Sequence, residues 1–142
     1  MTIEVVMRNF LQSYYLSLGE ESCFFLQLLN IAEQEIGCNL DPLSIAIICK
    51  HKNFIYLNLD NLKDKKNFLI YEHAKILELL TGKKWQYEKA AKTYKAKKNE
   101  YVINEYQNGS NTHFDSDNFH SLQDSITIKN GKIVTKRVFR IV

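Results

Sequence analysis

Apolar residues recur at helical spacing through the first part of the chain and alternate with polar residues near its end. Residues 3–16 carry apolar side chains at near-helical spacing, and Gly19 ends that segment. In residues 24–32 the apolar positions surround most of a helix, between a predicted N-cap at Ser22 and a C′ glycine at Gly37. A surface that broad predicts a central, largely buried helix.

Shorter elements are predicted in the middle of the chain. The pair Asp41-Pro42 is typical of an N-cap followed by a proline at the first helical position, and it predicts a helix that continues through Ile48. Residues 54–57 predict a short strand. Residues 72–80 predict a short helix, because a threonine and a glycine follow them and end the apolar pattern.

Residues 83–100 are rich in lysine, with Trp85, Tyr87 and Tyr94 interleaved. Such a segment could follow a nucleic-acid backbone, with the aromatic rings as stacking platforms for bases. Lysine also dominates the positive charge elsewhere in this chain, so we interpret the segment as a solubilising face and expect no nucleic-acid partner. Its weak periodicity predicts a strand that starts at Trp85, followed by a solvated, partly helical stretch.

The pattern changes to strand-like alternation from residue 100 onward. An Asn-Gly pair, the strongest short hairpin signal, stands at residues 130–131, and a similar pair at 108–109 predicts a turn. The strands predicted on either side of these turns are residues 101–106, 112–116, 125–129 and 132–142. Helices first and antiparallel strands second, without βαβ alternation, predict an α+β fold over residues 1–142 as one domain, with N-terminal helices packed on a C-terminal antiparallel β-sheet.

Composition narrows the class of protein. The chain has 142 residues and a net charge of +3. No apolar run approaches the length needed to cross a bilayer, and the N-terminus lacks the pattern of a secretory signal. Three cysteines without CxxC spacing argue against a disulfide framework and against a zinc site. We therefore expect a cytoplasmic protein with no cofactor and no membrane partner.

Cys23 is the first candidate functional residue. If Ser22 caps the helix, Cys23 takes the first helical position, where backbone N–H groups and the helix dipole favour a thiolate. The same N–H groups can hold an oxyanion during acyl transfer. The alternative is a structural role, since free cysteine is among the most buried residue types. Cys38 and Cys49 are interpreted as structural.

His113 is the second candidate. In a strand, its side chain projects to the same face as those of Asp115 and Asp117, where a carboxylate could orient it as a general base. The alternative is a solvated loop rich in Asp and Asn. His113, Asp115, Asp117 and His120 could also bind a divalent metal. The stretch lacks the turn glycine and distal carboxylate of a calcium loop, and we expect no metal.

Two segments resemble a known group of proteins. The segment SCFFLQLLNIAE (residues 22–33) is similar to the nucleophile helix of small papain-like (C39/NlpC-like) cysteine peptidases from phages, prophages and bacterial plasmids. The segment SITIKNGKIVTKRVF (residues 125–139) resembles their terminal hairpin, which follows a His-Phe strand. Within this group, the chain most resembles an uncharacterised spirochaete plasmid and prophage family (domain of unknown function family 261).

The resemblance implies that the cysteine helix packs on an antiparallel sheet that carries the histidine and then an Asp or Asn. It makes Cys23 the nucleophile and His113 the base. The family's third residue lies in an aromatic-Asp-Pro-like motif, and His120 stands at the matching carboxylate position. Asp115, Asp117 and Asp124 are the alternative orienting residues.

The resemblance also implies a glutamine that donates to the oxyanion, a few residues before the cysteine. That position is Ser17 in this chain, and the nearest glutamine is Gln12. We therefore expect either of two functions for a papain-like domain. The first is a cysteine peptidase or amidase that acts on a peptide or amide substrate through Cys23 and His113, with Asp115 or His120 beside them. The alternative is a catalytically inactive descendant that binds a protein partner in a phage or plasmid context.

Overall fold

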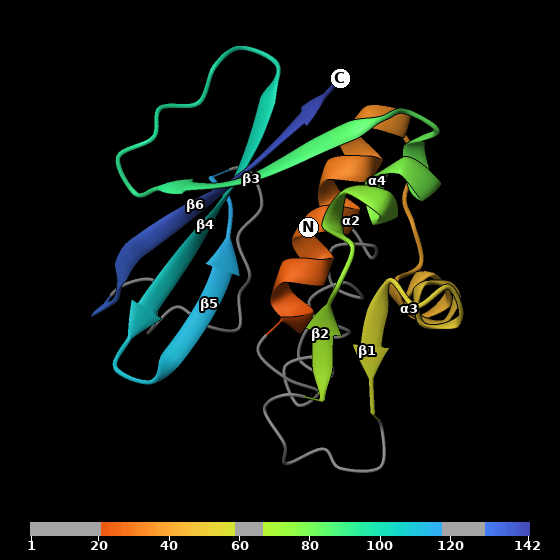
Figure 1. The fold of residues 1–142 in the computed structure, drawn as a ribbon, viewed down its shortest axis with the longest axis horizontal. Helices are drawn as coiled ribbons and strands as arrows, with labels where there is room; N and C mark the ends of the chain where they lie inside the picture. The colour runs from red at the N-terminus through yellow and green to blue at the C-terminus, as the bar shows by residue number, and fades with distance from the viewer. Residues whose placement is uncertain (1–20, 59–66, 118–129) are drawn as a thin grey trace.

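The computed structural model describes residues 21–58, 67–117 and 130–142 (Figure 1). The helices in this part of the chain are α2 (Ser22–Ile36), α3 (Pro42–His51) and α4 (His73–Thr81). The strands are β1 (Ile55–Leu57), β2 (Phe68–Ile70), β3 (Trp85–Ala91), β4 (Glu100–Asn108), β5 (Asn111–Asp115) and β6 (Lys132–Ile141). These three helices precede the four strands of the larger sheet, and the strand pairs in the described residues are antiparallel, so the predicted α+β class is confirmed.

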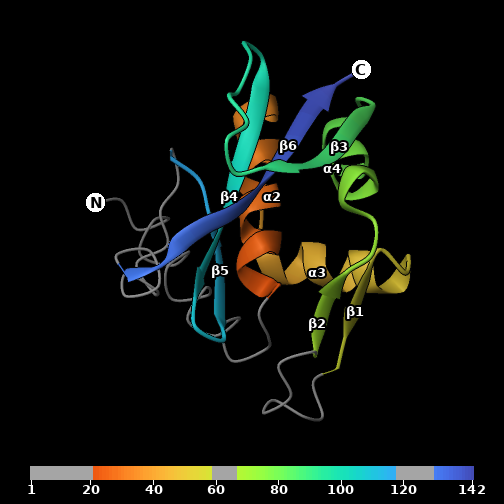
Figure 2. The same ribbon diagram turned by 60° about the vertical axis from the view of Figure 1, so that its left-hand side comes forward.

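Helix α2 is the central element of the fold, as its apolar pattern predicts. In Figures 1 and 2 it lies between the larger sheet on one side and α3, α4 and the small sheet on the other. The buried apolar residues of α2 are Cys23, Phe24, Phe25, Leu26, Leu28, Leu29, Ile31 and Ala32. Because these residues cover nearly the whole helix circumference, the helix needs packing partners on all sides.

The predicted ends of the helices are mostly confirmed. Gly37 ends α2 in the left-handed region at φ 74°, and its N–H donates to the Glu33 carbonyl at 2.8 Å. Asp41 caps α3 by accepting hydrogen bonds from the backbone N–H and the hydroxyl of Ser44, with a proline at the first helical position. Gly82 ends α4 at φ 72°.

Strands β1 and β2 form a small two-stranded sheet next to α3 (Figure 1). The sequence predicts β1 but not β2. Strand β2 has only three residues, and Phe68 and Ile70 are buried on either side of the half-buried Leu69. Such a short run has too few positions to show a clear period, so its pairing with β1 is a tertiary effect.

The larger sheet has the strand order β3-β6-β4-β5, which places the C-terminal strand β6 between β3 and β4. Trp85 pairs with Ile141 at one end of β3, and Tyr101 of β4 pairs with Phe139. The predicted turn at Gly109, with φ 61°, joins β4 to β5. Strand β5 is at the edge of this sheet and packs against α2. This edge brings the His113 strand to the Cys23 helix.

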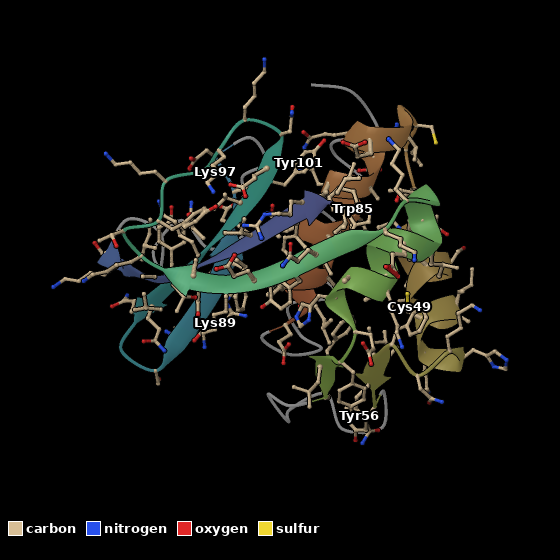
Figure 3. The ribbon with its side chains drawn as sticks, turned by 45° about the horizontal axis from the view of Figure 1, so that its top comes forward. Cys49, Tyr56, Trp85, Lys89, Lys97 and Tyr101 are labelled. Atoms are coloured by element: carbon tan, nitrogen blue, oxygen red, sulfur yellow. The ribbon has the colours of Figure 1, made fainter. Side chains whose placement is uncertain are left out.

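The lysine-rich segment differs from its prediction. Strand β3 continues to Ala91, and residues 92–99 join it to β4 without any helix. The prediction of a partly helical stretch is therefore wrong. Pairing with β6 along seven residues holds this sequence extended despite its weak period. The connecting loop is exposed as predicted, and in Figure 3 Lys97 lies on this loop at the outside of the molecule.

Several predicted elements lie outside the described residues. These are the helix at residues 3–16 and the strand at residues 125–129, which is the first strand of the hairpin predicted to turn at residues 130–131. Strand β6 itself is present over Lys132–Ile141, and it pairs with β3 and β4. Among the described helices, none combines the length and the apolar character that a bilayer crossing requires.

Candidate active site

Cys23 lies in the first turn of α2, one position further along than predicted. The helix begins at Ser22, and Glu21 precedes it with helical backbone angles, so the prediction of Ser22 as the N-cap is wrong. The Glu21 carbonyl accepts from the Phe25 N–H at 3.0 Å, while its carboxylate accepts from the Ile70 N–H at 3.2 Å. Cys23 is therefore the second residue of the helix and still lies within its first turn.

His113 lies in strand β5, not in a solvated loop. It is 0% exposed, its strand neighbour Phe114 is 5% exposed, and Asp115 is 1% exposed. From His113 to Asp115 the strand is therefore buried on both of its faces, although it stands at the edge of the sheet. The alternative of a hydrated Asp- and Asn-rich loop is wrong for this part of the stretch.

The structure brings Cys23 and His113 together from opposite ends of the chain. The Phe114 N–H, next to His113, donates to the Cys23 sulfur at 3.5 Å. The His113 ring interacts with the side chains of both Cys23 and Asp115. A thiol, an imidazole and a carboxylate thus share one buried location, and these are the groups that thiol catalysis uses.

Asp115 occupies the place of an orienting carboxylate. Its Oδ2 is 3.7 Å from His113 Nε2, which is an ion-pair distance and longer than an ordinary hydrogen bond. Its Oδ1 accepts from the Ser116 N–H at 2.9 Å and from Gln27 Nε2 at 3.1 Å. The Gln27 Oε1 in turn accepts from the Ser116 hydroxyl at 2.8 Å. One carboxylate oxygen is therefore fixed by the protein, and the other faces the histidine.

These contacts change the ionisation of His113. Burial alone lowers the pKa of an imidazole, because the charged ring loses its hydration. The interactions with Asp115 and Cys23 act in the opposite direction and outweigh burial, and together they raise the pKa of His113 to about 10. The ring is therefore an imidazolium at neutral pH. A cation beside a thiol favours its thiolate form.

The other predicted site residues have different outcomes. His120 and Asp124 lie outside the described residues, as do Ser17 and Gln12. Asp117 is exposed, and its Oδ1 accepts from Asn104 Nδ2 at 3.3 Å. Of the aspartates offered as the orienting residue and described in the structure, Asp115 is the one at the ion-pair distance from His113.

Gln27 is a further residue of the candidate site, and the sequence motifs do not single it out. It is 1% exposed and lies one helical turn after Cys23, on the same face of α2. A signal for it exists in the sequence, since it is the single long amide within the apolar run at residues 24–29. A buried amide in such a run needs hydrogen-bond partners, and that requirement predicts polar groups opposite it.

The remaining two cysteines differ from Cys23 in environment. Cys38 is exposed, and Cys49 is buried within α3, where Figure 3 labels it. Burial raises the pKa of the Cys49 thiol to about 11, against a smaller opposite effect of the Lys52 charge. None of the three cysteines is in a disulfide. Within the described ranges, no group of three or more His, Cys, Asp or Glu residues is arranged to hold a metal ion.

A hollow of about 210 Å³ lies further along α2, between that helix and β4. Its lining residues include Asn30, Gln34, Ser116 and Asp117, but not Cys23 or His113. The hollow is thus next to Ser116, whose N–H holds Asp115, and does not open onto the sulfur of Cys23.

Comparison of the chain with protein-family models, with curated proteins and with solved structures gives no match.

Proposed function

We propose that this chain is a papain-like cysteine hydrolase of the peptidase or amidase type, with Cys23 as the nucleophile and His113 as the base. One observation carries the proposal. A thiol in the first turn of a buried helix contacts the strand that carries a histidine, and this histidine faces a carboxylate that two further donors hold in place. These groups come from segments far apart in the sequence.

The proposed reaction has two halves. In the resting site the thiol proton is already on His113, and the Cys23 thiolate attacks the carbonyl carbon of an amide. The tetrahedral intermediate collapses when the imidazolium gives its proton to the leaving amine, and a thioester of Cys23 remains. A water molecule, deprotonated by His113, then attacks the thioester, and its collapse releases the acid and restores the Cys23 thiolate beside the His113 imidazolium.

The electrostatics support this assignment of roles. Asp115 faces Nε2 of His113, so we assign the proton exchange with sulfur to the other ring nitrogen, Nδ1. Backbone N–H groups in the first turn of α2 lie close to Cys23, and we assign them to the oxyanion. Asp115 does not exchange the proton in this mechanism, because its role is to keep the imidazolium oriented and charged.

A second candidate function rests on a different observation. The Cys23 side chain is 1% exposed and His113 is 0% exposed, so a substrate cannot reach them without movement of the surrounding residues. A catalytically inactive papain-like descendant would keep such a closed site as part of its core. Its function would be to bind a protein partner, in the phage or plasmid context that the resemblance implies. For either function we assign the protein to the reducing cytoplasm, because none of its three cysteines is in a disulfide.

Alkylation of the native protein distinguishes the two functions, because the chain supplies its own references. Cys38 reports an exposed thiol, and Cys49 reports a buried thiol with a raised pKa. Iodoacetamide at mildly acidic pH should label Cys23 at least about ten times faster than Cys38 if Cys23 is an accessible thiolate. Peptide mass spectrometry assigns the label to each cysteine.

His113→Asn is the matched variant for this experiment. It removes the imidazolium and should reduce Cys23 labelling to the rate of Cys38 or below. Labelling of Cys23 as slow as that of Cys49 in the native protein would refute the hydrolase and favour the inactive descendant. Fast labelling that persists in His113→Asn would refute His113 as the base.

A further inference from the structure

Gln27 is a buried amide inside an apolar helix. It lies one turn after Cys23 in α2, and it is 1% exposed. Burial of an amide without partners costs roughly 1–3 kcal/mol, so its contacts decide whether the position is favourable. Both ends of the Gln27 amide have partners in or beside β5, namely Asp115 and Ser116. Gln27 therefore links the cysteine helix to the histidine strand.

The orientation of this amide is determined by its neighbours. Gln27 Nε2 donates to Asp115 Oδ1 at 3.1 Å, and Gln27 Oε1 accepts from the Ser116 hydroxyl at 2.8 Å. If the amide were rotated by half a turn, its oxygen would face the carboxylate oxygen with no proton between them. The carboxylate thus selects one orientation, and the Ser116 hydroxyl supports it.

The consequence falls on Asp115. Two neutral donors, Gln27 Nε2 and the Ser116 N–H, bind the same oxygen, Oδ1. The second oxygen, Oδ2, is left in the direction of His113 Nε2. A carboxylate held at one oxygen by two donors has little freedom to rotate, and an oriented carboxylate holds a histidine in one position.

We propose that Gln27 is a positioning residue for the site, which acts through Asp115 to hold His113 against Cys23. This inference rests on the proposed function. It also assigns a role to a glutamine on the nucleophile helix itself, after the cysteine. Gln27 does not contact the reacting atoms in this role, so its removal should alter the state of His113 without removing any group that takes part in the chemistry.

Gln27→Met tests the role, because methionine has nearly the same shape as glutamine but lacks the amide. The measurement is the pH titration of the His113 imidazole by NMR. In the native protein His113 should stay protonated well above neutral pH. In Gln27→Met the midpoint should fall by about one pH unit, and Cys23 alkylation at mildly acidic pH should slow by about tenfold. If Gln27 only filled space in the core, the His113 midpoint and the rate of Cys23 alkylation would both stay unchanged in Gln27→Met.

Two further variants complete the test. Gln34→Met is the matched control, because Gln34 is an exposed glutamine on the same helix, and it should leave the His113 midpoint unchanged. Ser116→Ala removes only the hydroxyl that supports the Gln27 amide, and it should move the His113 midpoint in the same direction by a smaller amount. If Gln27→Met does not fold, Ser116→Ala decides the question, and an unchanged midpoint in that variant overturns the inference.

The failure of this inference can be told from the failure of the proposed function. A native His113 midpoint close to the ordinary imidazole value would mean that no imidazolium faces Cys23, and the proposed function would fail. A raised native midpoint that Gln27→Met leaves unchanged would overturn the role of Gln27 alone. The proposed function would then stand with Asp115 held by other groups.

Discussion

The backbone N–H of Phe114 donates to the sulfur of Cys23 at 3.5 Å, so the histidine strand and the cysteine helix meet at a hydrogen bond to the candidate nucleophile itself. The same residue packs its ring 4.4 Å from the ring of Phe24, the next residue of the helix. These two contacts determine the position of β5 along the axis of α2. Because His113 directly precedes Phe114, they also fix the histidine beside the thiol.

Replacement of Cys23 by alanine should change how stability depends on pH. The folded-state pKa of His113 is about 10, raised above its ordinary value of 6.5 partly by Cys23. A raised histidine pKa stabilises the folded state fully below the ordinary value, and this stabilisation is lost as pH rises through the folded value. In Cys23→Ala the pKa of His113 is lower, so less stability should be lost over that range.

Urea unfolding at several pH values between about 6 and about 10 measures the effect. Cys49→Ala serves as the control, since it also removes a buried thiol but leaves the contacts of His113 intact. Below about pH 8, where the Cys49 thiol stays protonated in the folded and the unfolded chain, it should lower the free energy of unfolding without reducing the loss of stability with rising pH. An equal pH slope in the native protein and Cys23→Ala would show that the thiol does not act on His113.

His73 should make the protein less stable in mild acid. Its ring stacks on Tyr87 at 4.4 Å, and burial together with the nearby Arg137 charge lowers the pKa of His73 from 6.5 to about 4. The unfolded chain therefore binds a proton first as pH falls, and stability present above about 6.5 is lost towards about 4, by roughly 3 kcal/mol. His73→Phe keeps the stacking and should remove most of this loss. Thermal unfolding at neutral and mildly acidic pH measures it.

Much of the fold follows from local pattern and capping chemistry. The broad apolar surface of residues 24–32 predicts a central helix, and Gly37 and Asp41-Pro42 mark helix ends that the structure confirms. Alternation predicts β4 and β5, because strands with a regular period show it within a few residues. The predicted start of α2 is wrong by one position. The helix begins at Ser22 because Glu21 precedes it as the cap residue, and the pattern of apolar and polar side chains does not reveal this backbone conformation.

The candidate site is less predictable, because tertiary contacts create it. The sequence identifies Cys23, His113 and Asp115 as candidates but cannot choose Asp115 over Asp117, since both would project to one side of a strand that continued to residue 117. In the structure β5 ends at Asp115. The two aspartates differ in burial in the folded structure. Asp115 is buried and accepts a hydrogen bond from Gln27 of the helix, while Asp117 is exposed. Gln27 is missed for the same reason. Its partners lie on a strand far away in the sequence, and no local period indicates them.

The Arg137–Glu105 ion pair should contribute strongly to stability. Arg137 Nη2 donates to Glu105 Oε1 at 2.9 Å, and both side chains are 13% exposed. Arg137 also donates to the Tyr87 hydroxyl at 2.6 Å and to Thr135 Oγ1 at 3.1 Å. Glu105→Met leaves a mostly buried cation without its counter-charge and should cost on the order of 3 kcal/mol. Urea unfolding measures this loss.

A double-mutant cycle separates this charge effect from packing. The pair Glu105→Met with Arg137→Met should lose clearly less stability than the sum of the two single variants, because neither charge is left alone. Lys75→Met is the surface control, since Lys75 lies 3.9 Å from Glu72 with both side chains about half exposed. It should cause no measurable change. Additive losses in the cycle would show that Arg137 and Glu105 are not energetically coupled.

The end of α2 at Gly37 should depend on backbone conformation alone. Gly37 has φ 74°, and a Cβ added there would meet no atom within 4 Å, so a larger residue causes strain but no clash. Gly37→Ala should cost about 1 kcal/mol, and Gly37→Asn less, because asparagine tolerates the left-handed region better than alanine does. Gly82, with φ 72° and equally open space, should give the same order of losses in urea unfolding. Equal losses for alanine and asparagine at both sites would mean that something other than φ determines the cost.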